Sequence, residues 1–176
     1  MEPAVNEAVK HTPSGKILAT ATPVTLKGEK YISLLDRTGA ESRTLSLPLP
    51  RLVRLAENEL FRQIKSECPD AKSYIQESLR AVGIDPNELS ALVLGCTHFV
   101  YFTDIFRTLM PTSCRIFNGI SGTASHMINS LALLETEQVA NAEDVLRRTR
   151  FYICGKPANS EELCGIKNCI YLLCNL

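Results

Sequence analysis

The sequence predicts an α/β protein, with three α/β/α layers built around a mainly parallel sheet. Short apolar segments alternate along the chain with longer segments whose apolar residues recur at helical spacing, and this alternation is typical of parallel sheets covered by helices. Residues 91–95 (ALVLG) are apolar throughout, as expected of a strand buried on both faces. A chain of 176 residues with 45% hydrophobic residues suits one globular domain, or one with a small appendage.

Several short segments have the composition of strands. Each is apolar or alternates between polar and apolar residues, and proline or glycine ends several of them. The strands predicted in the first two thirds of the chain cover residues 17–22, 43–47, 91–95 and 114–117. A final strand is expected at 150–154 (RFYIC), whereas the tail at 155–176 fits either a helix or an irregular end.

The segments between these strands place apolar residues on one side of a helix. The predicted helices cover residues 26–39, 51–66, 70–82, 101–110 and 121–131. Gly39 is expected to end the first helix, and Asp70 and Ser121 are the expected N-caps of the third and fifth. The residues expected to be buried by these last two helices are Ile75, Leu79, Val82, Ala124, Met127, Ile128 and Leu131.

Composition excludes some classes of function. The 19 Lys and Arg residues balance 19 Asp and Glu residues, so no overall charge favours binding to nucleic acid or to an acidic membrane. No apolar stretch approaches the roughly 20 residues of a membrane span, and the first residues lack the apolar core of a signal peptide. A cytoplasmic protein is expected. The 7 cysteines indicate reduced thiols, and their spacing does not predict a metal site.

Three chemically capable side chains, Cys96, Thr97 and His98, follow directly after the predicted strand at 91–95. Ligands of parallel α/β proteins bind beyond the carboxyl ends of the strands. The start of a following helix favours a thiolate and an anionic ligand such as a carboxylate. On these residues alone, a second interpretation stays open, in which Cys96 is a small packed side chain and His98 a surface cap.

Five segments, in the same order, resemble segments of glutamate racemases, which belong to the aspartate/glutamate racemase superfamily. LVLGCTHF at 92–99 is similar to that family's second catalytic cysteine motif, LVLGCTHYP. The other four segments are ILATATPVTLKGEKY (17–31), LPLPRLVRLAE (47–57), RIFNGISGTASHMINSL (115–131) and RFYICGKPANSEEL (150–163). The resemblance covers roughly residues 3–163, so it is not confined to one motif.

The resemblance implies a racemase that uses no pyridoxal cofactor and no metal. In this family two cysteines flank glutamate, and one removes the α-proton as a thiolate while the other donates a proton as a thiol. Cys96 is then the base for the L enantiomer, and His98 assists the thiol. The other residues implied at the site are Thr97 at the substrate carboxylate, Thr25 and Thr22 lining the pocket, and Glu57 as a polar neighbour. The product would be D-glutamate for peptidoglycan in a bacterial cytoplasm.

The chain also departs from the family pattern. No segment resembles the family's first half, which carries the first catalytic cysteine, and we therefore expect a truncated chain. Residues 1–117 would form the α/β lobe with the GCTH motif, and residues 118–176 the returning helix and strand of an incomplete first lobe plus a tail. Val100, Asn118 and Cys154 replace residues typical of the family. The cysteine-rich ending suggests a shifted reading frame or a truncated gene.

Three functions stay open at this point. The first is a glutamate racemase part, active with a complementing N-terminal half. The second is a non-catalytic remnant or amino-acid-binding lobe, and the third is a single-cysteine relative from the same superfamily. The expected partners are glutamate and either the complementing half or a second copy in a homodimer, and neither nucleic acid nor a membrane is expected.

Overall fold

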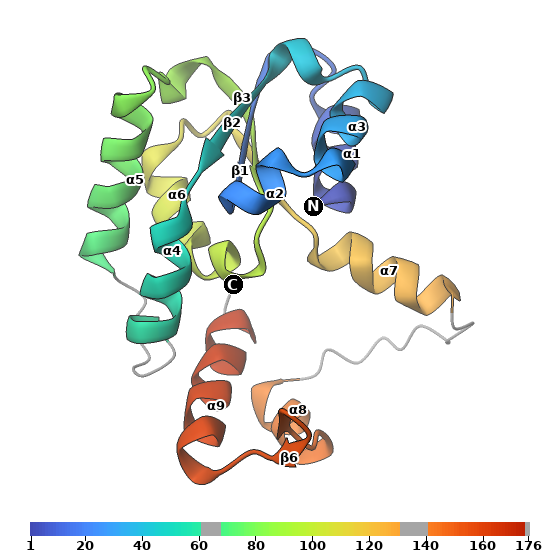
Figure 1. Cartoon of the computed structure of the whole chain (residues 1–176), viewed down its shortest axis with the longest axis vertical. Helices are drawn as coiled ribbons and strands as arrows, with labels where there is room; N and C mark the ends of the chain where they lie inside the picture. The colour runs from blue at the N-terminus through green and yellow to red at the C-terminus, as the bar shows by residue number, and fades with distance from the viewer. Residues whose placement is uncertain (61–67, 131–140, 175–176) are drawn as a thin grey trace.

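The main sheet contains four parallel strands in the order β2-β1-β3-β4. The computed structural model describes residues 1–60, 68–130 and 141–174. The strands of this sheet are β1 (Lys16–Ala21), β2 (Thr44–Pro48), β3 (Leu89–Leu94) and β4 (Arg115–Asn118), and Figure 1 shows them at the centre of the upper part of the molecule. The four strands lie within a residue or two of the predicted segments, and the prediction of a mainly parallel sheet is confirmed.

Helices connect the strands and extend the chain beyond them. The α-helices are α1 (Glu2–His11), α2 (Pro23–Lys27), α3 (Glu29–Arg37), α4 (Pro50–Leu55), α5 (Pro69–Ala81), α6 (Thr103–Leu109), α7 (Ile120–Ser130), α8 (Ala142–Arg148) and α9 (Ser160–Cys174). Shorter turns are the 3₁₀ segments η1 (Glu41–Arg43), η3 (Pro86–Glu88) and η4 (Thr97–Phe102), and the π turn η2 (Ala56–Leu60).

The sheet separates two hydrophobic cores, because successive side chains along a strand point to opposite faces. Leu18 and Leu92, paired across β1 and β3, pack with α4, α5 and α6 on one face. Ile17 and Val93 pack with α1 and α3 on the other face. The three expected layers are therefore present (Figure 1), and the two central strands are almost completely buried, as the apolar run at 91–95 predicts.

Two predictions about the helix after Pro69 are wrong. Asp70 is not the N-cap, because α5 begins at Pro69 and Cys68 occupies the capping position. Proline is suited to the first helical position, since its missing N–H would have no partner there. Val82 is 56% exposed rather than buried, because it follows the last residue of the helix and turns away from the core.

Other helix boundaries shift without changing the fold. The helix predicted at 26–39 is divided into α2 and α3 at Gly28, and Gly39 follows the second of them with a φ of +62°. The helix predicted at 51–66 ends as α4 at Leu55 and continues into the π turn η2; residues 61–66 lie outside the described residues. The helix predicted at 101–110 begins earlier, as the 3₁₀ segment η4.

The apolar side of α7 is not buried as predicted. Ala124 is exposed, Met127 is 54% exposed and Ile128 is half-buried, while Leu131 lies outside the described residues. Figure 1 shows the reason, because α7 projects away from the sheet and the helices that cover it. The predicted Ser121 cap is also wrong, since α7 begins at Ile120 and the side chain of Asn118 accepts the Ile120 N–H at 3.0 Å.

The end of the chain forms a separate small unit. The strand predicted at 150–154 is reduced to β5 (Tyr152–Ile153), which pairs antiparallel with β6 (Lys156–Pro157) instead of joining the main sheet. Cys154 and Gly155 form the turn between them, with φ of 49° and 80°. The tail is helical, as α9. In the described ranges, none of the helices combines the length and the apolar character needed to cross a membrane.

Candidate active site

The candidate site lies where the strand order of the sheet reverses. From β1 the chain leads to β2 on one side, whereas β3 lies on the other side of β1. Such a switch point leaves a crevice beyond the carboxyl ends of the two strands, and ligands of open α/β sheets bind there. Thr22 and Cys96 each stand two residues past the last pair of this ladder, Thr20 and Leu94.

Gly95 keeps the strand end in register as the chain leaves the sheet. Its N–H donates to the Thr20 carbonyl at 2.8 Å, so the ladder continues for one more hydrogen bond. Cys96 then takes the N-cap position of η4, where its carbonyl accepts the Phe99 N–H at 3.0 Å. Phe99 and Phe102 are buried in the core. Their burial fixes η4 against the sheet and leaves the residues between Gly95 and Phe99 at the surface of the crevice.

A thiol, an imidazole and a carboxylate are aligned at this edge. The Cys96 Sγ lies 3.8 Å from the His98 Nδ1, and the His98 Nε2 lies 3.4 Å from the Glu57 Oε1. The His98 side chain is 27% exposed and the Glu57 side chain 52% exposed. Glu57 comes from the π turn η2, a type of helix irregularity that is frequent at functional sites. One ring nitrogen of the His98 imidazole therefore faces the Cys96 thiol, and the other faces the Glu57 carboxylate.

Cys96 and Thr97 line a cavity of about 490 Å³. Val100 and Tyr101 from η4 form part of its wall, and Ile120, Thr123 and Met127 from α7 form another part. The cavity is therefore bounded partly by the exposed apolar side of α7. Among the described residues, no group of three or more His, Cys, Asp or Glu side chains is arranged to hold a metal ion.

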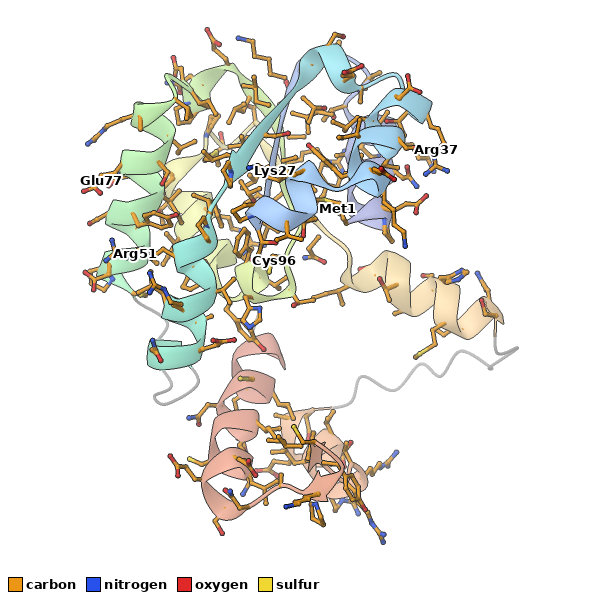
Figure 2. All side chains as sticks on the ribbon, viewed as in Figure 1. Met1, Lys27, Arg37, Arg51, Glu77 and Cys96 are labelled. Atoms are coloured by element: carbon orange, nitrogen blue, oxygen red, sulfur yellow. The ribbon has the colours of Figure 1, made fainter. Side chains whose placement is uncertain are left out.

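The two threonines expected in the pocket do not line the Cys96 cavity, since Thr22 is the N-cap of α2 and Thr25 lies within that helix. The hydroxyl groups of Thr22 and Thr25 are hydrogen-bonded to each other at 2.9 Å. Thr25 lines a second cavity of about 550 Å³, together with Lys30 and Tyr31. Met1 lines both cavities, and Figure 2 labels Met1 and Cys96.

Met1 and Tyr101 are residues of the site that the sequence analysis did not find. Tyr101 stands three residues after His98, one turn of a 3₁₀ segment along the chain, so its place in η4 was a usable signal. Burial raises the pKa of its phenol, and the nearby Cys169 raises that pKa further. No sequence pattern connects Met1 with Gly95, because the contact depends on how α1 packs against β3 and β4.

Alanine at Gly95 is expected to lower the free energy of unfolding by about 1–3 kcal/mol, as overpacked sites typically do. Its Cβ would lie 2.9 Å from the Thr20 carbonyl oxygen, which is fixed in the sheet, and 2.1 Å from the flexible end of Met1. Urea denaturation followed by circular dichroism measures the change. Gly119→Ala is the control, since the nearest atom to its Cβ is 3.9 Å away. Equal stability of Gly95→Ala and the parent would contradict this prediction.

Solved structures share the fold described above. The glutamate racemase of Campylobacter jejuni matches with a TM-score of 0.68 and 19% sequence identity, over 98% of this chain and 61% of that one. The Escherichia coli glutamate racemase, solved in complex with L-glutamate and the activator UDP-MurNAc-Ala, matches with a TM-score of 0.63 and 22% identity, over 82% of this chain and 57% of that one. By fold, the chain is an α/β protein that shares its architecture with these two solved structures.

Similarity in sequence identifies the particular family. The glutamate racemase of Campylobacter concisus is 42% identical over 135 residues, which are 76% of this chain and 49% of that protein. The glutamate racemase of Halothermothrix orenii is 40% identical over 131 residues, which are 74% of this chain and 49% of that protein. No family model matches the chain. The chain belongs to the glutamate racemase family, and it spans about half the length of the curated relatives it matches.

Proposed function

We propose that this chain is the Cys96 half of a glutamate racemase, in which Cys96 transfers the α-proton on one face of glutamate. The observation that carries the proposal is the alignment of the Cys96 thiol, the His98 imidazole and the Glu57 carboxylate at the carboxyl edge of the sheet. A base within reach activates a cysteine by taking its proton and leaving the thiolate. His98 is in that position, and Glu57 holds the opposite ring nitrogen.

The geometry supports a proton path without a cofactor. When the His98 Nε2 carries a proton toward Glu57, the Nδ1 can accept the proton of the Cys96 thiol. The resulting thiolate removes the α-proton of L-glutamate, and the electron pair is delocalised into the substrate α-carboxylate. The Thr97 hydroxyl holds that carboxylate, since Thr97 lines the same cavity as Cys96. Thr22 and Thr25 extend the binding surface from the neighbouring strand end.

A second thiol on the opposite face belongs to the part of the family pattern that this chain lacks. We assign residues 1–117 to the lobe that carries Cys96, and residues 118–176 to the returning helix and strand of the other lobe plus the tail. The exposed apolar side of α7, next to the cavity, supports this assignment, because it offers a surface that a complementing lobe would cover. The expected partner is a complementing N-terminal half, and the whole enzyme would supply D-glutamate for peptidoglycan in the cytoplasm.

The test is the exchange of the glutamate α-proton for deuterium, followed by proton NMR for each enantiomer in deuterated buffer. With one thiol present, L-glutamate is expected to incorporate deuterium and stay L-glutamate, because the Cys96 thiol exchanges the abstracted proton with the solvent and returns a deuteron to the same face. D-glutamate is expected to keep its α-proton. Addition of a separately expressed N-terminal half is expected to convert exchange into racemisation.

A second candidate function is supported by the same open cavity. A lobe that binds a dicarboxylic amino acid without catalysing a reaction would need Thr97, Thr22 and Thr25, but not the Cys96 thiol. Absence of exchange from either enantiomer, on protein with a cooperative unfolding transition, would refute catalysis by this chain alone. Saturable glutamate binding under those conditions would then favour the binding lobe. Exchange of the α-proton of another substrate would instead favour a single-cysteine relative from the same superfamily.

A further inference from the structure

The first turns of α7 form one wall of the Cys96 cavity, and a threonine hydroxyl belongs to that wall. Leu94 of β3 pairs with Asn118 of β4, and adjacent strands lie about 4.8 Å apart. The two segments that follow these strands therefore leave the same edge of the sheet side by side. Thr97 follows β3 and Thr123 follows β4, and both line the cavity.

Two contacts fix the place of the first turn of α7. The Asn118 side chain accepts the Ile120 N–H at 3.0 Å. Gly122 packs against Pro3 at the start of α1, because a Cβ added at Gly122 would lie 2.6 Å from the Pro3 Cβ. Figure 1 shows the start of α7 near the N-terminus of the chain, in agreement with this contact. The next residue, Thr123, is thereby held at the cavity.

The Thr123 hydroxyl is open to the cavity. Thr123 is exposed, and its Oγ1 lies 3.9 Å from the place that a Cβ of Gly119 would take, so the missing side chain leaves the hydroxyl uncovered. The other α7 side chains that line the cavity are apolar, namely Ile120, Ala124 and Met127. The described residues that line it include no Lys, Arg or His. A carboxylate on this side of the cavity would therefore take its side-chain hydrogen bond from Thr123.

We propose that Thr123 is a specificity-determining residue, whose hydroxyl donates a hydrogen bond to the γ-carboxylate of glutamate in the Cys96 cavity. This inference rests on the proposed function, because it takes glutamate as the ligand of that cavity. Thr97 adjoins the thiol in sequence and is assigned to the α-carboxylate, next to the reacting carbon. Two methylene groups separate that carbon from the γ-carboxylate, and they suit the apolar side chains of α7. The two hydroxyl groups thus bind the two ends of the substrate.

The test compares ligands with and without the γ-carboxylate, on the full chain. L-2-aminobutyrate has the α-centre of L-glutamate and lacks this group, and the dissociation constant of each ligand is measured by NMR titration. Thr123→Val removes the hydroxyl and keeps the shape of the side chain. It is expected to weaken the binding of L-glutamate at least about tenfold, as for the loss of a hydrogen bond to a charged group. Binding of L-2-aminobutyrate is expected to stay unchanged.

Three further variants make the test specific. Thr123→Ser keeps a hydroxyl and is expected to bind L-glutamate as the parent does. Thr97→Val is expected to weaken both ligands alike, since both carry the α-carboxylate. Thr108→Val is the control, because Thr108 is an exposed threonine on α6 whose hydroxyl donates to the Ile105 carbonyl. It is expected to leave both dissociation constants unchanged.

Three results would overturn the proposal. The first is a Thr123→Val variant that binds L-glutamate as tightly as the parent. The second is an equal loss for both ligands in Thr123→Val, which would mean that the variant changes the shape of the wall and not one hydrogen bond. The third is a parent chain that binds L-glutamate no more tightly than L-2-aminobutyrate, because the γ-carboxylate would then contribute nothing.

Failure of this proposal and failure of the proposed function are distinguishable. Exchange of the glutamate α-proton tests the chemistry of the Cys96 thiol, and the two dissociation constants test the recognition of the substrate side chain. A parent chain that exchanges the proton, with no loss of L-glutamate binding in Thr123→Val, would keep the racemase function and refute the role of Thr123. A selective loss in Thr123→Val, without exchange by the parent, would keep the role of Thr123 and refute catalysis by this chain alone.

Discussion

Replacing Cys96 by alanine is expected to lower the rate of α-proton exchange from L-glutamate by at least about 10³-fold, the range for loss of an essential acid–base group. The thiol is the only group of the aligned set that lines the cavity, since His98 and Glu57 lie behind it. Without the sulfur, no base of the set reaches the α-carbon. Proton NMR in deuterated buffer measures the loss, with the free energy of unfolding recorded on the same protein.

Cys154→Ala is the matched control for this variant. Cys154 is an exposed thiol in the turn between β5 and β6, which form a sheet of their own apart from the main sheet. Its removal is expected to leave the exchange rate unchanged. If L-glutamate still exchanges its α-proton in Cys96→Ala, another group is the base and the proposed role of Cys96 is wrong.

Replacing Phe99 by alanine is expected to lower the free energy of unfolding by about 3–5 kcal/mol, the usual range for a buried phenylalanine. Phe99 is completely buried and packs in the core between the sheet and the helices α4, α5 and α6. The loss is a large part of the roughly 5–15 kcal/mol that stabilises a typical domain. Urea denaturation followed by far-ultraviolet circular dichroism gives the value.

The same variant is expected to disturb the site, because Phe99 follows His98 directly and anchors η4. Ile32→Ala is the control, since Ile32 is a large apolar residue on α3 that is mostly exposed. Its replacement is expected to change the free energy of unfolding by less than about 0.5 kcal/mol. A loss below about 1 kcal/mol in Phe99→Ala would show that η4 does not depend on this anchor.

The parallel sheet could be predicted from the sequence because its strands carry their own signal. The run at 91–95 is apolar on both faces, and β3 is buried on both faces. Helix ends were less predictable, since they depend on single residues. Pro69 could occupy the first helical position, which placed the cap at Cys68 and left Asp70 inside the first turn.

The burial of α7 could not be predicted from its periodicity. Ala124, Met127 and Ile128 form an apolar side at helical spacing, and such a pattern indicates that a helix packs against something. It carries no information on whether the partner surface lies in the same chain. In the described part of this chain, α7 keeps much of that side exposed and shares it with the Cys96 cavity.

The site was predictable where its residues are close in sequence. Cys96, Thr97 and His98 are consecutive, so one strand end places all three. Glu57 came from the resemblance to the racemases, and the structure places its carboxylate near His98.

The order of the strands has a consequence for how the protein folds. The central strands, β1 and β3, are far apart in the sequence. The Thr20 hydroxyl donates a hydrogen bond to the Val93 carbonyl, which is 73 residues further along the chain. Bringing two such distant strands together lowers the entropy of the chain before the contacts between the strands can compensate. Pairing of β1 with β3 is therefore slow compared with helix formation. β1 and β2 can meet early, as neighbours along the nascent chain. The crevice that holds Cys96 forms only when β3 adds to them, which makes this edge one of the last features of the sheet to form.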